Sequence, residues 1–471
     1  MPSTVQHHKV PEITGLTRRY ADYVAGLRFS DLPPEVIEKA KLLIRDGIGN
    51  QTAASAISEP ASRMISLARE WGGAPQCTVV GYGVRLPAPV AALCNAMLGH
   101  GVELDDAHGS GLLKGGSVIN PSAFAAAEMS GASGRDVITA VVAGYDIAVR
   151  IAKAINPAHR RRGFHTTGTV STFASASVTA KLLGGDSEVI ANALGLAGMQ
   201  AAGIQSYLND PCLAKPFSPG KAAFNGVIAG VMAARGFTGP KAVLECEEGF
   251  LNAYADVVDY ERLTDALGSS FAVLEVGFKP HAACRYAHGP LDLAQILYRE
   301  HGVSLKEIGA IEVEMSEMAI RQASKPTCAN LNVAMGSTEF GVLLALKKGR
   351  NGLRDYMEGF EDREIHDRLG EVVLKPNPAY GLTGRASALQ LTLADGRILR
   401  ESSDEPRGEP GNPLTAGELE SKFHSMASLV LGNDAAGGLG DMLMALEFQN
   451  TAGEVLAKTV VASGTPEVLA T

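Results

Sequence analysis

The most constraining feature of the sequence is a series of long runs of Ala, Leu, Val and Gly between Pro87 and Ala234. The runs, such as "PAPVAALCNAMLGHGV" and "TFASASVTAKLLGG", are interrupted by Gly, Asn and Pro, without the turn-linked alternation that antiparallel strands show. An earlier segment, Asp31–Ala56, opens with Asp and Pro and then spaces apolar residues along one helical face. Residues 1–274 are therefore predicted to form a helical domain in which small side chains allow close helix contacts.

The pattern changes after about Leu274. Segments Ile308–Glu317 and Arg385–Ser403 alternate apolar with polar residues, and the "ADGR" turn inside the second predicts a hairpin. We expect a smaller α+β lid domain at 275–403. Helical character returns after the Pro/Gly-rich stretch "SDEPRGEPGNP", so residues 404–471 are expected to rejoin the helical domain. The predicted fold class is mainly α, with a large all-helical domain and a smaller α+β lid.

Charge and cysteine usage exclude several classes of function. A formal net charge of -9 over 471 residues argues against a nucleic-acid surface, because binding phosphates requires a basic face. The six cysteines are far apart and form no CxxC pair that would begin a zinc or iron–sulfur site. No apolar run reaches the roughly 18 residues of a membrane span, and the N-terminus lacks a signal pattern. We expect a cytoplasmic protein with no membrane partner.

The first polar segment is "HGVELDDAHGSGLLK", residues 100–114. A metal site built from His100, Asp105, Asp106 and His108 is chemically possible, but their spacing matches no helical HxxxH or ExxH arrangement. A solvated loop with caps and turns is the second interpretation. The third, which we favour, is one wall of an acid/base pocket.

Three further segments combine cations or histidines with apolar surroundings. The first is a helix start with His165 beside it, whose free N–H groups suit a carboxylate. The second is a Pro/Gly-rich turn with two lysines, Lys215 and Lys221. The third is a cationic edge that faces the predicted interdomain cleft and contains Lys279, His281, Arg285 and His288. Capped or solvated helix ends would explain each segment alone. Together they suit a small di- or tricarboxylate, which needs fixed cations and an acid/base pair.

Five stretches resemble the MmgE/PrpD family in order and spacing. They are "ELDDAHGSGLLKGGSVINPSAFAAAE", "RRGFHTTGTVSTFASASVTAKLLG", "KPFSPGKAAFNGVIAGVMAARGFTGP", "ECEEGFLNAYAD" and "FKPHAACRYAHGPLD". The family includes 2-methylcitrate dehydratase, cis-aconitate decarboxylase and iminodisuccinate epimerase. The resemblance implies a helical domain made from both ends of the chain, an inserted lid, a site between them, a homodimer, and no metal or organic cofactor.

The resemblance also implies roles for particular residues. His165 is the preferred acid/base, and Asp105 or Asp106 would orient it or share the proton transfer. Lys215 and Lys279 would bind substrate carboxylates and stabilise an enolate-like charge. We expect His281 and Arg285 to add to the substrate-binding cations.

Two positions depart from the family pattern. Lys114 stands where many members have a histidine. The pKa of an ordinary lysine is about 10.4, so a lysine is a poor proton shuttle at neutral pH unless it is desolvated. Phe340 stands where a relative that decarboxylates cis-aconitate has a tyrosine, which makes this decarboxylation less favoured.

These observations predict a cofactor-independent lyase, most simply a dehydratase of a small hydroxylated di- or tricarboxylate resembling 2-methylcitrate, with Lys114 counted in the catalytic set. The alternatives are an epimerase of an imino- or amino-dicarboxylate and a decarboxylase of the cis-aconitate type. A carboxylate-binding member that has lost catalysis is a further alternative.

Overall fold

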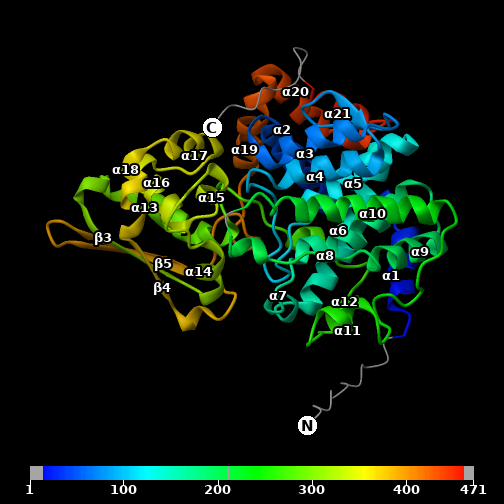
Figure 1. Cartoon of the computed structure of the whole chain (residues 1–471), viewed down its shortest axis with the longest axis horizontal. Coiled ribbons are helices and arrows are strands. Elements are labelled where there is room, and N and C mark those ends of the chain that lie inside the picture. Colours follow the sequence, from blue (N-terminus) through cyan, green and yellow to red (C-terminus); the bar gives the residue numbers. More distant parts are fainter. Residues whose placement is uncertain (1–13, 211, 461–471) are drawn as a thin grey trace, which may run out of the picture.

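The computed structural model describes residues 14–210 and 212–460, which form a large helical body and a smaller lobe that contains a sheet (Figure 1). The expected mainly α fold class with a smaller α+β part is confirmed. Within the described residues, no helix has the length and apolar character needed to cross a bilayer.

The helical body contains one small hairpin that the sequence did not predict. Its helices are α1 (Leu16–Gly26), α2 (Pro34–Ile57), α3 (Glu59–Trp71), α4 (Ala88–His100), α5 (Gly116–Ser130), α6 (Gly134–Ile155), α7 (Ala158–Arg161), α8 (Thr166–Leu182), α9 (Ser187–Gly198), α10 (Phe217–Ala234), α11 (Phe250–Tyr254) and α12 (Glu261–Thr264). The hairpin pairs β1 (Cys77–Val79) with β2 (Val84–Leu86), and short 3-10 turns lie at η1 (Phe29–Asp31), η2 (Ser206–Leu208) and η3 (Ala272–Glu275).

Helix α8 runs through the centre of this body and is buried along nearly its whole length. Small residues explain how α10 can lie so close to it. A Cβ added at Gly226 would lie 2.2 Å from the Ser175 side chain, and one at Gly230 would lie 2.6 Å from Thr179. The close packing of these two helices fixes the relative positions of their N-terminal ends, where the site is found.

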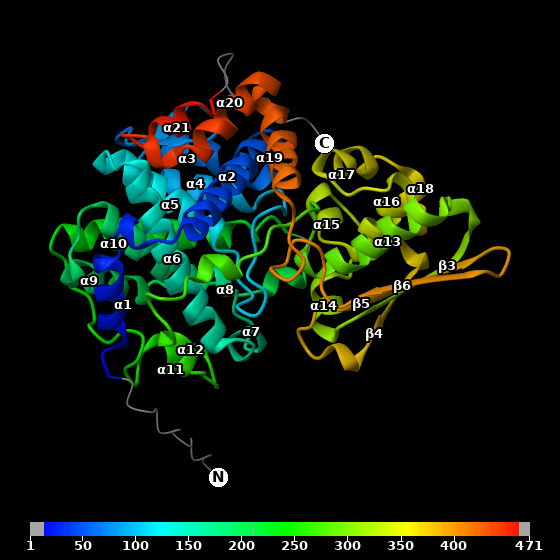
Figure 2. The same ribbon diagram turned by 180° about the vertical axis from the view of Figure 1, so that it is seen from behind.

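The smaller lobe is a four-stranded sheet covered by short helices. Its elements are η4 (Arg285–Ala287), α13 (His288–His301), η5 (Leu305–Glu307), β3 (Ile308–Met315), α14 (Glu317–Ala323), α15 (Leu331–Met335), α16 (Thr338–Lys348), α17 (Leu353–Phe360), α18 (Arg363–Arg368), η6 (Leu369–Glu371), β4 (Val372–Pro376), η7 (Pro378–Tyr380), β5 (Ser387–Leu393) and β6 (Ile398–Ser403). The strand order is β4-β3-β5-β6, with β3 and β4 parallel and the other pairs antiparallel. Helix α13 packs against β5 and β6, on the side shown in Figure 2.

The chain then returns to the helical body. Helices α19 (Ala416–Leu431), α20 (Asn433–Met444) and α21 (Glu454–Ala457), with η8 (Leu446–Phe448), lie beside the N-terminal helices, and both α19 and α20 pack on α2 (Figures 1 and 2). Inside this contact Lys422 pairs with Asp46 at 2.5 Å and donates to the Leu104 carbonyl at 2.8 Å. The C-terminal helices therefore support the loop that follows α4.

We retain the division at residues 274 and 403 as a proposal for the domain organisation. Its outer limits, residues 1 and 471, lie outside the described residues. The contacts of α19 with α2 support the return of the third segment to the first.

Candidate active site

The acidic segment forms a loop between α4 and α5 that is held in an unusual backbone conformation. Glu103 and Leu112 have φ values of 53° and 51°, a left-handed region that side chains other than glycine seldom occupy. Glu103, Asp105 and Asp106 are all buried despite their charge. Strained backbone and buried carboxylates are features that cluster at functional sites.

Two lysines surround the Glu103 carboxylate. Lys215 forms an ion pair with one of its oxygens, and Lys279 reaches the other at 3.3 Å and the Glu103 carbonyl at 2.9 Å. Burial alone would raise the pKa of Glu103, but Lys215 and Lys279 outweigh it and hold that pKa well below its usual range. The same pairing raises the pKa of Lys215, which stays protonated.

Asp105 lies between a lysine and a histidine. It pairs with Lys279 at 3.2 Å and contacts Nδ1 of His100 at 2.6 Å. Burial opposes ionisation, yet His100 and Lys279 hold the pKa of Asp105 well below its usual range. Asp105 therefore stays negative and fixes the His100 ring.

Asp106 faces away from this network. It accepts hydrogen bonds from the Gly116 N–H at 3.0 Å and from the Tyr145 hydroxyl at 3.0 Å. A Cβ on Gly116 would lie 2.3 Å from an Asp106 oxygen, so the glycine permits this close approach. Burial and the negative charge of Asp105 raise the pKa of Asp106 to about 7, so a large fraction of this carboxyl group is protonated near neutral pH.

His165 directly precedes α8, with its ring against the start of α10. Its Nδ1 lies 2.8 Å from the Ser218 hydroxyl, and its ring packs edge-on against Tyr207 with centroids 5.6 Å apart. Burial lowers the pKa of His165 well below 6.5, and the Arg160 charge lowers it further. The imidazole is therefore neutral at pH 7 and can accept a proton.

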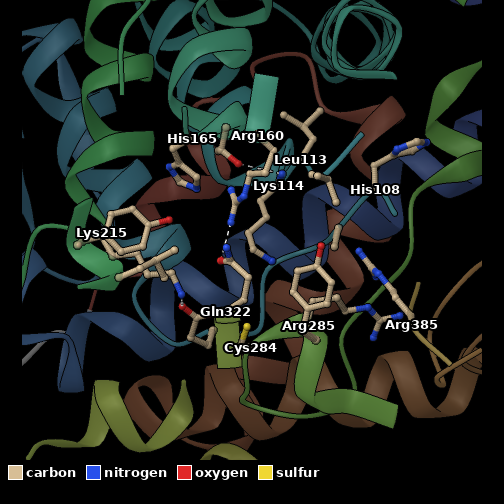
Figure 3. Close-up of a pocket in the computed structure, with 17 residues that line it drawn as sticks. His108, Leu113, Lys114, Arg160, His165, Lys215, Cys284, Arg285, Gln322 and Arg385 are labelled. Carbon is tan, nitrogen blue, oxygen red and sulfur yellow. Dashed lines mark hydrogen bonds and ion pairs between the residues drawn. The ribbon is translucent and has the colours of Figure 1, made fainter. Parts of the chain in front are cut away.

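His165 lines a cavity that lies between the helical body and the smaller lobe (Figure 3). The cavity volume is about 620 Å³, including the space at its opening. Five cationic side chains share this cavity. The lining residues are Glu103, Ala107, His108, Leu112, Leu113, Lys114, Arg160, His165, Thr167, Tyr207, Leu208, Lys215, Cys284, Arg285, Tyr286, Gln322 and Arg385. A neutral base surrounded by fixed cations can bind an organic polyanion and remove a proton from it.

Lys114 extends into this cavity (Figure 3). Its backbone N–H donates to the Thr167 hydroxyl at 3.1 Å, and its carbonyl accepts from Ser117 at 3.0 Å. Burial, with Lys279 nearby, lowers the pKa of Lys114 to about 7. The desolvation that a proton-shuttling lysine requires is therefore present.

The smaller lobe contributes two arginines to the cavity. Both Arg285 and Arg385 pair with Glu409, which is itself buried. Arg160 of α7 donates to the Gln322 side chain of α14 at 2.6 Å and so connects the two lobes across the cavity. These three guanidinium groups suit carboxylates, which they can bind in a bidentate manner.

The structure brings together four of the predicted residues as lining of the cavity: His165, Lys114, Lys215 and Arg285. Lys279 and Asp105 lie behind Glu103 as buried supports. His281 is not part of the cavity wall; its Nε2 contacts Asp292 at 2.7 Å inside the smaller lobe.

One expected contact is absent. His165 was expected to be oriented by Asp105 or Asp106, but its ring contacts Ser218, while the aspartates contact His100, Lys279, Gly116 and Tyr145. The reason is that the acidic loop turns both carboxylates inward, toward α4 and α6.

The sequence interpretation missed several cavity residues. Arg160 and Arg385 were not proposed as site residues, and Tyr207 lies in a polar connection with no motif. Glu103 was visible as a third carboxylate in the acidic segment, and its position between two lysines depends on contacts with residues more than 100 positions away. Of these residues, Arg160 adjoins a recognised stretch in the run "RRRGFH", and Glu103 opens the stretch that begins "ELDDAHG".

The four residues of the metal interpretation do not converge. His100 pairs with Asp105, Asp106 contacts Tyr145, and His108 lies 3.2 Å from Glu275. Across 14–210 and 212–460, no group of three or more His, Cys, Asp and Glu side chains has the arrangement of a metal site.

Phe340 lies away from both cavities that Glu103 and Lys215 line. It is fully buried in α16, stacked on Tyr356 with centroids 5.7 Å apart. It lines neither the cavity of His165 nor the adjoining one of about 1180 Å³, which shares Glu103 and Lys215. The missing hydroxyl therefore does not alter the walls of these cavities, and the argument from Phe340 against decarboxylation does not hold.

Comparison with known proteins identifies the family of this chain. The model of the MmgE/PrpD N-terminal domain matches residues 18–263, and that of the MmgE/PrpD C-terminal domain matches 281–444. The cis-aconitate decarboxylase of Aspergillus terreus (strain NIH 2624 / FGSC A1156) is 25% identical over 461 residues, covering 92% of this chain and 94% of the relative. The cis-aconitate decarboxylase of Homo sapiens is 26% identical over 465 residues, covering 92% of each chain. A cis-aconitate decarboxylase-like protein of Aspergillus oryzae, oryM, is 26% identical, covering 94% and 96%.

A helical body, a smaller sheet-containing lobe and a cationic cavity with a neutral histidine form a site suited to acid/base chemistry on organic anions. The chain belongs to the MmgE/PrpD family, and the expected enzyme class, a lyase of that family, is confirmed.

Proposed function

We propose that this protein is a cofactor-independent dehydratase of a small hydroxylated di- or tricarboxylate. The observation that carries the proposal is a neutral His165 in a cavity that also holds Lys114, Arg160 and Lys215. Elimination of water begins with removal of a proton beside a carboxylate, and this step needs an unprotonated base and cations that stabilise the developing charge.

The geometry supports a division of roles. His165 takes the proton, with Ser218 holding its Nδ1 so that Nε2 is the reacting nitrogen. Lys215, kept protonated by Glu103, binds a substrate carboxylate, as do Arg160 and Arg285. Lys114, whose pKa of about 7 leaves it partly protonated at neutral pH, donates a proton to the departing hydroxyl. From behind the cavity wall, Lys279 positions Glu103 and Asp105 positions His100.

Decarboxylation of a cis-aconitate-like substrate is the second candidate. Two of the relatives named above are cis-aconitate decarboxylases, and Phe340 lies outside the cavity walls. Decarboxylation needs a proton donor for the carbanion left by CO2, a role open to protonated Lys114. The neutral state of His165 favours proton abstraction, which places dehydration first.

A panel of 2-methylcitrate, citrate, cis-aconitate, tartrate and iminodisuccinate tests the proposal. We expect a hydroxylated member to give an alkene that absorbs in the ultraviolet, with release of water and no CO2. Release of CO2 from cis-aconitate would select the second candidate. A deuterium-labelled stereoisomer formed in D2O would identify an epimerase.

Thermal stabilisation by tricarboxylates without turnover of any panel member would contradict the proposal and favour a non-catalytic binding protein. The homodimer and the cytoplasmic location implied earlier stay predictions; light scattering of the purified chain tests the first.

A further inference from the structure

Lys114 differs from the other lysines that surround the acidic loop. Lys215 and Lys279 pair with Glu103, and Lys422 pairs with Asp46. In the described part of the chain, no carboxylate oxygen lies within ion-pair distance of the Lys114 ammonium group, although Glu103 shares its cavity. Lys114 is thus the cavity lysine whose amine is not engaged by an acid.

The surroundings of Lys114 favour the unprotonated amine. Burial and the positive charge of Lys279 lower the pKa of Lys114 to about 7. An amine that is desolvated and placed beside other cations is a known way to prepare a nucleophilic lysine. Its backbone is held at both the N–H and the carbonyl, so the side chain starts from a fixed point.

The cavity offers binding groups for the substrate of such an amine. Arg160, Arg285 and Arg385 line the same space and can bind two carboxylates, and His165 is a neutral acid/base that lines it too (Figure 3). A 2-oxo dicarboxylate has the two carboxylates for these arginines and a ketone group that the Lys114 amine can attack.

We propose that Lys114 forms a covalent imine with the carbonyl carbon of a 2-oxo dicarboxylate bound in this cavity. The amine nitrogen attacks the carbonyl carbon, and the carbonyl oxygen takes up a proton to give a carbinolamine. That oxygen then leaves as water, which carries away both protons of the original amine. The C=N bond remains. No oxidant, reductant or metal takes part, and hydrolysis returns the amine.

Reductive trapping tests this inference. The full-length protein is incubated with 2-oxoglutarate and cyanoborohydride at several pH values, and the modified residue is located by peptide mapping. We expect one reduced adduct, on Lys114, with a yield that rises as the pH passes through about 7 because the amine loses its proton. Succinate, which has the two carboxylates but no ketone group, should compete with 2-oxoglutarate for the cavity and lower the yield of the adduct.

Two variants provide the comparison. Lys114→Arg keeps the positive charge but cannot form an imine, so it should lose the adduct. Lys221→Arg changes another lysine whose pKa is lowered by burial, to about 8. The Lys221 amine donates to the Ala202 carbonyl, and its side chain lines a different cavity. In this variant the adduct on Lys114 should form as it does in the wild-type protein.

Absence of an adduct on Lys114 in the wild-type protein, or labelling that occurs on Lys215, Lys279 or Lys221 instead, would overturn the inference. Because the mapping is done on the wild-type protein, it decides the question even if Lys114→Arg fails to fold. This result does not depend on whether the protein is a dehydratase, because the test of that proposal measures turnover of substrates that have no ketone group.

Discussion

At the scale of single residues, His165 is the side chain on which the proposed chemistry depends most. Its ring is buried, contacts Ser218 and is neutral at pH 7. We expect His165→Gln to lower kcat by roughly 10²–10⁴-fold on the panel substrate, because a positioned general base contributes about that much. Steady-state kinetics measures the loss, and thermal melting checks that the variant is folded.

The exposed His301, at the end of α13, provides the matched control. His301→Gln should leave kcat and KM unchanged. Turnover by His165→Gln at the wild-type rate would remove His165 from the catalytic set.

The pH dependence of kcat/KM depends on two groups with lowered pKa values. His165 works as a base, so activity is lost only as the pH falls through a pKa well below 6.5. Lys114 works as an acid, so activity is lost as the pH rises through about 7. We expect a bell-shaped profile in the wild-type protein. In Lys114→Arg the activity should be much lower and the alkaline limb should be absent, since arginine stays protonated and does not give up its proton. An alkaline limb that is the same in both proteins would exclude Lys114 as its origin.

The sequence identified the residues that belong to short motifs and missed those that depend on tertiary contacts. His165 and Lys215 stood in recognisable stretches and line the cavity, whereas Arg385 has no local signal. The role of Glu103 could not be predicted, because its partners Lys215 and Lys279 lie far along the chain.

At the scale of elements, the contact of α8 with α10 positions the site. Gly226→Ala would place a Cβ 2.2 Å from the Ser175 side chain and 2.8 Å from the Thr172 carbonyl. We expect it to lower the free energy of unfolding by about 1–3 kcal/mol, as overpacking of a core does. Urea denaturation measures the change.

Gly437 of α20 is the control position, since a Cβ there would meet no atom within 4 Å. Gly437→Ala should raise stability by about 0.4–1 kcal/mol through lower entropy of the unfolded chain. Equal effects at the two positions would contradict the packing argument.

Periodicity predicted several individual elements and one hairpin, but not the parallel strand pair of the sheet. The helix at 31–56, the strand at 308–317 and the hairpin around "ADGR" correspond to α2, β3 and the β5–β6 pair. Strand β4 was missed, because its parallel pairing with β3 depends on a crossover through α14–α18 that no local pattern reveals.

At the scale of the whole molecule, a buried ion pair connects the two ends of the chain. Lys422 of α19 and Asp46 of α2 are both buried, and burial shifts their pKa values toward the uncharged forms. We expect Lys422→Met to cost about 3–5 kcal/mol, since it leaves a buried carboxylate without its partner. Adding Asp46→Asn should restore much of that loss, as measured by denaturation. Additive losses in the double variant would show that the two charges do not interact.

The packing of α19 on α2 also bears on how the protein is made. Helix α2 leaves the ribosome early, whereas α19, which covers it, follows only after the entire smaller lobe has been translated. Until then the exposed apolar face of α2 is a surface on which nascent chains can aggregate or chaperones can bind. The helical body therefore completes its packing only after most of the chain has been translated.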